Sequence, residues 1–157
     1  LNYGNSEVQM KKIKLNTVFF SVIGAAWVLL ISASLWPTSY WFEVDVITVE
    51  DAKVGEPVIM TVDRNIKRPF YAEWTVTVRE AVADGYVIRC LSKAATDYRV
   101  DATFPDPLTL SWWANSECDG LGVGSYILTT SWDIRPDILG LPKKTLTAES
   151  NVFKISE

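Results

Sequence analysis

The chain has 157 residues, 48% of them hydrophobic, and its 15 lysines and arginines against 19 aspartates and glutamates leave a net charge of −4. Nucleic-acid binding depends on a basic surface, so we expect no DNA or RNA partner. The sequence contains no histidine and only two cysteines, which excludes Ser-His-Asp catalysis, imidazole metal ligands and four-thiolate zinc sites. We therefore expect no cofactor, no metal and no enzymatic activity.

A long apolar segment dominates the N-terminal part of the chain. Residues 17–36 carry no charge, and a helix of that length spans roughly 30 Å, the thickness of a bilayer's hydrocarbon core. Pro37 cannot continue a helical hydrogen-bond ladder and marks the end of the segment. We predict a transmembrane helix over residues 15–36, between a cytoplasmic segment of residues 1–14 and an exported domain of residues 37–157.

The residues on either side of the apolar segment predict its direction. Lysines precede it and aromatic residues follow it: Lys11, Lys12 and Lys14, then Trp36, Tyr40 and Trp41. Positive charge remains in the cytoplasm, so we expect a single-pass protein of the inner (cytoplasmic) membrane with a periplasmic or extracellular C-terminal domain. The alternative is a cleaved signal peptide, because the small residues Ser32, Ala33 and Ser34 resemble a cleavage site. Signal peptides have shorter apolar regions, about 7–15 residues, which favours a retained signal-anchor.

The remainder of the chain has the alternation of apolar and polar residues that is typical of β-strands. In the clearest run, Trp74, Val76 and Val78 alternate with Thr75, Thr77 and Arg79. Gly- and Pro-containing turns separate seven predicted strands, at residues 41–50, 57–63, 71–80, 85–92, 107–114, 124–134 and 144–156. The short connections favour an all-β antiparallel β-sandwich of the immunoglobulin-like or fibronectin-like class, with a closed barrel as the alternative.

Three segments carry a resemblance to a known class of domain. The stretch DGLGVGSYIL at residues 119–128 resembles the entry to strand F of immunoglobulin-like domains, where a Gly-x-Tyr element makes a tyrosine corner. Residues 54–58 and 150–155 are similar to early and final strands of bacterial and phage modules of this kind. The resemblance, to bacterial or phage membrane-anchored immunoglobulin-like domain proteins, spans residues 41–156 and implies that Tyr126 is the corner residue. Leu128 stands where antibody domains have their second cysteine, so their inter-sheet disulfide is not expected.

The two cysteines, Cys90 and Cys118, predict one disulfide bond. An exported domain meets oxidising conditions, and an even number of cysteines permits full pairing. In the chain-entropy model a loop of this size stabilises the fold by roughly 3 kcal/mol. The alternative is a pair of thiols without a role.

Two clusters are candidate binding sites. Adjacent residues on a strand point to opposite faces, so one of Trp112 and Trp113 should be exposed, where it can hold a sugar ring, a peptide or a partner protein. The second cluster lies in the segment 63–69, which we expect to be a connection that presents Arg64, Lys67 and Arg68 to an acidic partner. For each cluster the alternative is structural: an indole covered by a loop, and solvated charges.

The carboxylates form no recognisable catalytic or calcium-binding pattern. Asp133 and Asp137 flank Arg135, and Glu117 lies close to Asp119, but neither spacing is typical of a glycosidase or a calcium loop. The function that we expect is therefore a membrane-anchored binding or structural module with a protein partner in the envelope, as an accessory subunit of an envelope or phage-related complex. The alternatives are a carboxylate-based cell-wall or glycan-acting enzyme, and a secreted effector released by signal cleavage.

Overall fold

The computed structural model describes the backbone of residues 4–135 and 142–157, and the side chains of residues 17–135 and 142–157. The chain forms two compact units, residues 1–36 and residues 37–157. In chain order the elements are α1 (Gly4–Ser34), η1 (Thr38–Tyr40), β1 (Phe42–Val49), β2 (Ala52–Lys53), β3 (Met60–Ile66), β4 (Phe70–Val82), β5 (Gly85–Tyr98), α2 (Leu110–Trp113), β6 (Gly124–Arg135), β7 (Lys144–Glu149) and β8 (Phe153–Ser156).

The first unit is the helix α1. Its window Thr17–Ser34 has a mean hydropathy of 2.0, and none of it is buried within the protein. Eighteen helical residues extend about 27 Å, so this window is long and apolar enough for a membrane anchor, and a signal sequence would have the same properties. The helix ends at Ser34, two residues before the predicted end, although the Trp36 amide still donates to the carbonyl of Ala33.

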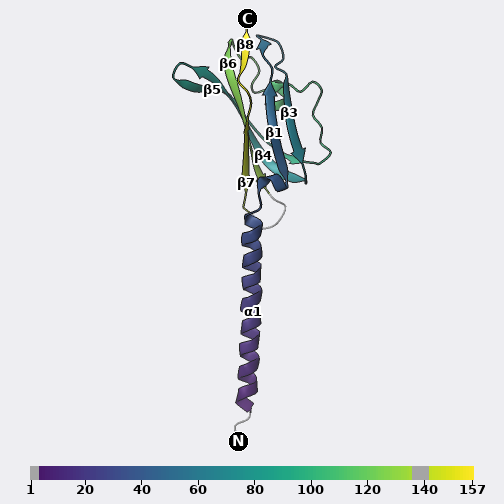
Figure 1. Ribbon diagram of the computed structural model, residues 1–157, viewed down its shortest axis with the longest axis vertical. Helices are drawn as coiled ribbons and strands as arrows, with labels where there is room; N and C mark the ends of the chain where they lie inside the picture. Colours follow the sequence, from purple (N-terminus) through teal and green to yellow (C-terminus); the bar gives the residue numbers. More distant parts are fainter. Residues whose placement is uncertain (1–3, 136–141) are drawn as a thin grey trace. The chain divides into compact units, whose positions relative to one another are not determined.

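The second unit is mostly β and contains two open sheets among its described residues, so no closed barrel forms. Strands β1 and β3 pair antiparallel in a two-stranded sheet, which Figure 1 shows as two neighbouring arrows. The larger sheet has the order β2-β8-β6-β4-β5, and β7 pairs with the other part of β6. All of its pairs are antiparallel except β2 with β8.

The core lies between these sheets because each strand presents its apolar residues to one side. Buried side chains come from the small sheet (Phe42, Ile47, Val49, Met60 and Val62) and from the large sheet (Ala72, Val76, Val78, Leu128, Trp132 and Ile134). The rings of Phe42 and Trp132 touch across the interface, with centroids 5.2 Å apart. Trp132 is buried in this core, whereas Trp74, from the alternating run 74–79, is half-buried at its margin.

One predicted strand is wrong. Residues 107–114 contain the one-turn helix α2, and only Thr109 makes a β-bridge, to Ile59. The Thr109 hydroxyl accepts a hydrogen bond from the Trp112 amide at 3.2 Å, a helix-capping contact that favours the turn over an extended strand. Asn115 and Ser116 follow with φ of 55° and 62°, so the chain cannot continue as a strand there.

Other strand boundaries also differ from the prediction. Strand β3 begins at Met60 and continues to Ile66, through residues expected to form a connection, and β2 forms where a turn was expected. The final predicted strand is divided into β7 and β8. Between them, the Asn151 side chain accepts from the Val49 amide at 2.8 Å and donates to the Val49 carbonyl at 2.9 Å, which joins the C-terminal segment to β1.

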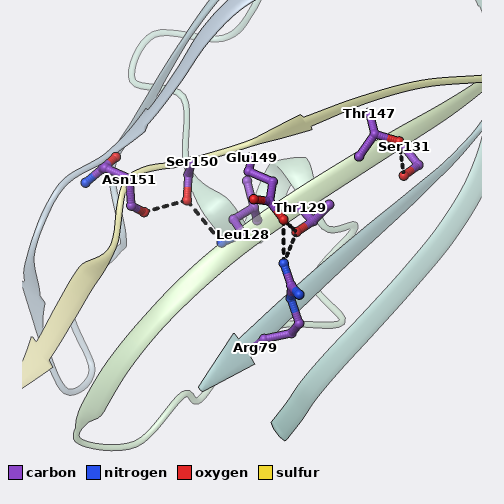
Figure 2. Close-up of polar contacts among 8 residues, drawn as sticks. All are labelled: Arg79, Leu128, Thr129, Ser131, Thr147, Glu149, Ser150 and Asn151. Carbon is purple, nitrogen blue, oxygen red and sulfur yellow. Dashed lines mark hydrogen bonds and ion pairs between the residues drawn. The ribbon is translucent and has the colours of Figure 1, made fainter. Parts of the chain in front are cut away.

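Polar side chains connect β4, β6 and β7, as Figure 2 shows. Arg79 Nη2 donates to Thr129 Oγ1 at 2.7 Å and to Glu149 Oε1 at 2.6 Å. Nearby, Ser150 Oγ accepts a hydrogen bond from the Leu128 amide at 3.0 Å. The Arg79 contacts join β4, β6 and β7 on the face away from the core, whereas the Ser150 contact is buried.

Candidate functional site

A cleft of about 520 Å³ lies between the C-terminal half of β5 and the segment around α2. Ligand sites in proteins have volumes of about 300–1,000 Å³, so the cleft is large enough for a side chain or a small ligand. Its walls include Trp74 of β4, residues 94–98 of β5, Arg64 of β3, residues 102–103, and the α2 segment from Ser111 to Ser116 without its buried Ala114. Thr130 and Trp132 of β6 also line the cleft, so four strands and the α2 segment meet at one site.

The two adjacent tryptophans have different surroundings in this cleft. Trp112 is 54% exposed, whereas Trp113 is 8% exposed and belongs to the core. The structural reason differs from the predicted one, because these residues lie on a helical turn and not on a strand. Successive side chains on a helix point about 100° apart, which also allows one indole to be buried and the next to face solvent.

The walls of the cleft are aromatic, and the polar atoms of its buried rings have partners. Trp113 Nε1 donates to Thr130 Oγ1 at 3.0 Å, and Trp132 Nε1 donates to the Tyr98 hydroxyl at 3.0 Å. Burial raises the pKa of Tyr98 to about 12, so this hydroxyl stays protonated at neutral pH. These hydrogen bonds fix the rings beneath the cleft, so the site is formed before a ligand arrives.

Arg64 is a half-buried cation without an acidic partner among the described side chains. Its guanidinium lies 3.6 Å from the centroid of the Phe104 ring and 5.8 Å from that of Tyr98. Burial is the main cause that lowers the pKa of Arg64, and the Tyr98 phenolate, which forms only at high pH, opposes this shift. Arg64 Nη2 donates to the Ala102 carbonyl at a long 3.5 Å, so the guanidinium has further N–H donors for an anionic or carbonyl group in the cleft.

Lys67 and Arg68 do not join Arg64. Lys67 Nζ forms an ion pair with Glu43 at 2.7 Å, and the Arg68 guanidinium lies over the Tyr40 ring, 4.2 Å from its centroid. The prediction of one basic loop is wrong because Arg64 belongs to β3, and only the residues after Ile66 form the connection. The three cations contact three different parts of the domain.

The predicted Cys90–Cys118 disulfide is confirmed, with a Cα–Cα distance of 5.4 Å. It joins β5 to the segment that follows α2. Neither cysteine lines the cleft, but Cys90 belongs to β5, whose C-terminal half does, and Cys118 belongs to the segment after α2, whose residues Asn115 and Ser116 do.

The carboxylates do not gather in this cleft. Asp97 is the one acidic residue among its lining residues. Asp133 instead accepts from Lys143 at 2.6 Å and from Thr145 at 2.7 Å, and the Lys143 hydrogen bond is the main cause that lowers the pKa of Asp133. Asp137 lies outside the described residues.

No protein-family model, curated protein or solved structure matches this chain. Sequence reasoning named Trp112 and Arg64, but it missed Trp74, Asp97 and Phe104, since their periodicity and spacing do not distinguish them from other strand and loop residues.

Proposed function

We propose that the chain is a single-pass membrane protein whose C-terminal domain binds a protein partner of the cell envelope through the aromatic cleft. The observation that carries this proposal is the combination in one cleft of an exposed indole, Trp112, with an unpaired half-buried cation, Arg64. Tryptophan and arginine are enriched among the residues that dominate binding energy at protein interfaces. The pre-formed walls lower the entropy that a partner loses on binding.

The strand order supports the finer proposal of an immunoglobulin-like sandwich. In the large sheet, β8, β6, β4 and β5 follow one another as strands G, F, C and C′ do in variable-type domains. The Tyr126 hydroxyl donates to the Gly122 carbonyl at 2.9 Å, which is the hydrogen bond of a tyrosine corner at the start of the F-like strand. The second sheet has only two strands, and α2 occupies the place where a further strand was expected.

The membrane part of the proposal depends on α1 and its flanks. Three lysines before the apolar window favour a cytoplasmic N-terminus and a domain on the opposite side of the membrane. A disulfide in the domain agrees with that compartment, because such bonds persist where conditions are oxidising. Proteins of phage or bacterial envelope complexes meet these conditions, and we propose that the chain is an accessory subunit of one.

The experiment is crosslinking of the full chain in the membranes of cells that produce it, followed by mass spectrometry of captured proteins. Trp112→Ala is the test variant, and Tyr86→Ala is the matched control, since both side chains are 54% exposed aromatics on the same domain. We expect one defined partner with the wild type and the control, and its loss with Trp112→Ala. The same partner with all three proteins, or no partner with any, would overturn the proposal.

The same samples test the anchor. We expect the full-length chain in the membrane fraction, with its domain digested by protease added from the exported side. A soluble chain whose mass corresponds to a start near Leu35 would instead identify α1 as a cleaved signal sequence and the protein as a secreted effector.

A further inference from the structure

The longest edge of the large sheet is strand β5, which has 14 residues and pairs only with β4. Figure 1 shows that the β4–β5 hairpin extends away from the rest of the domain. Among the described residues, the backbone groups of β5 that face away from β4 make no hydrogen bond to other backbone groups. An unpaired strand edge of this length is a template for pairing with another strand.

The exposed face of β5 carries a positive residue and a negative residue on opposite sides of Ala95. Lys93, Ala95 and Asp97 lie on the same face, opposite Thr75, Glu73 and Tyr71 of β4, and all three are exposed. Neither Lys93 nor Asp97 has an ion-pair partner among the described side chains. A small residue thus lies midway between a free cation and a free anion.

We infer that β5 pairs antiparallel with β5 of a second copy of this chain, in the register that places Ala95 opposite Ala95. In an antiparallel pair related by a twofold axis, the residue two positions before the centre faces the residue two positions after it. Lys93 of each copy therefore faces Asp97 of the other, and the pairing makes two ion pairs. Each opposite-charge pair across strands contributes roughly 0.2–1 kcal/mol in general.

Two other registers that also align the exposed residues of β5 are less favourable. Centring the pair on Lys93 brings two lysines together, and centring it on Leu91 places Arg89 opposite Lys93. Lysine on an edge strand normally discourages pairing, because its charge finds no partner on the incoming strand. A second copy in the Ala95 register is the occupant that supplies an acid to this lysine.

This pairing also concerns the cleft. On the inner face of the sheet, Ala94 of one copy faces Thr96 of the other, and both residues line the cleft. The two clefts of a dimer would therefore meet at the new seam. The inference itself does not depend on what the clefts bind.

Cysteine crosslinking tests the register in the full chain in detergent micelles. Both native cysteines are in the Cys90–Cys118 bridge, so Ala95→Cys introduces the single free thiol. Directly opposed residues of an antiparallel pair have Cα atoms about 4.5–5.5 Å apart, within the range of a disulfide. Leu91→Cys is the matched control on the same exposed face, and in this register its two copies would lie about 26 Å apart.

Under mild oxidation we expect a covalent dimer with Ala95→Cys and a monomer with Leu91→Cys, as separated by non-reducing gel electrophoresis. Equal crosslinking of both variants, or a monomer with both, would overturn the inference. Selective crosslinking of Ala95→Cys to a different protein would also overturn it and would assign the edge to a heterologous strand.

Charge reversal tests the ion pairs in the Ala95→Cys background. Lys93→Asp alone should lower the rate of dimer crosslinking by about tenfold or more, because it replaces two attractive pairs with two repulsive ones. Adding Asp97→Lys should restore the rate, since the pairs form again with exchanged signs. Lys154→Asp, which makes the same charge change at an exposed position of β8, is the control and should have little effect. Equal losses with Lys93→Asp and Lys154→Asp, or no rescue by the double reversal, would overturn the inference.

Discussion

Removal of the Cys90–Cys118 disulfide is the perturbation whose effect can be calculated most directly from the structure. The bridge closes a loop with a sequence separation of 28 residues. In the chain-entropy model, opening this loop lowers the free energy of unfolding by about 3–4 kcal/mol, because the unfolded chain gains conformational freedom. Cys118 is also 4% exposed, so its replacement removes packing around α2. We expect the double variant Cys90→Ala/Cys118→Ala to lose at least this amount.

Urea unfolding of the full chain in detergent micelles, followed by tryptophan fluorescence, measures this loss. With m values of about 1–3 kcal/mol/M, the midpoint should fall by more than about 1 M. Ser92→Ala is the control on the same strand, because Ser92 is 2% exposed and its hydroxyl has no partner among the described residues, so its removal should be neutral or slightly stabilising. A loss below about 1 kcal/mol in the double variant would refute the loop-entropy reasoning, and so would an equal loss with Ser92→Ala.

Three further predictions concern the core, the pH dependence and the connection between the sheets. Trp113→Ala should lower the free energy of unfolding by about 3–5 kcal/mol and Trp112→Ala by less, about 1–2 kcal/mol, because Trp113 is 8% exposed whereas Trp112 is 54% exposed; similar losses in urea unfolding would contradict this difference. The pKa of Tyr98 is raised to about 12 in the folded protein, so its contribution to stability is complete below about pH 10, the unfolded value, and is lost as the pH rises toward 12. Urea midpoints at increasing pH should therefore fall more steeply in the wild type than in Tyr98→Phe, and parallel curves would contradict the assignment. Asn151→Ala should cost about 2 kcal/mol by removing two hydrogen bonds to Val49, and Asn151→Asp should also destabilise, because its second carboxylate oxygen cannot donate to the Val49 carbonyl; a wild-type midpoint in thermal unfolding for either variant would exclude this role.

Most of the secondary structure could be predicted because alternation is a local property. The run from Trp74 to Arg79 lies within β4, and its Val76 and Val78 are buried as the alternation indicates. The cysteine pairing could also be predicted, since the two cysteines of the chain permit only one intramolecular bridge. The structure of segment 107–114 could not be predicted from the sequence, because its apolar residues fit an inward-facing strand as well as a capped helical turn. The Thr109 hydrogen bond favours the turn.

The residues of the candidate site could not be predicted from local sequence patterns in the same way. Arg64 reaches the cleft, whereas Lys67 and Arg68, only three and four residues later, contact Glu43 and Tyr40. The spacing of these residues in the sequence does not predict their different contacts, because the end of β3 and the packing of the two sheets decide where each side chain points. A basic cluster in the sequence therefore became three separate contacts.

The amino-acid order by itself determined the apolar helix, the predominance of β-strands and the bridge between the two cysteines, because each depends on hydrophobic periodicity, chain length or the identity of single residues. Only the tertiary structure decided that β5 lies at the edge of the large sheet and that β3, β4, β5 and α2 meet around Trp112. Strand neighbours are selected by contacts between residues far apart in the chain, and no local pattern contains that information.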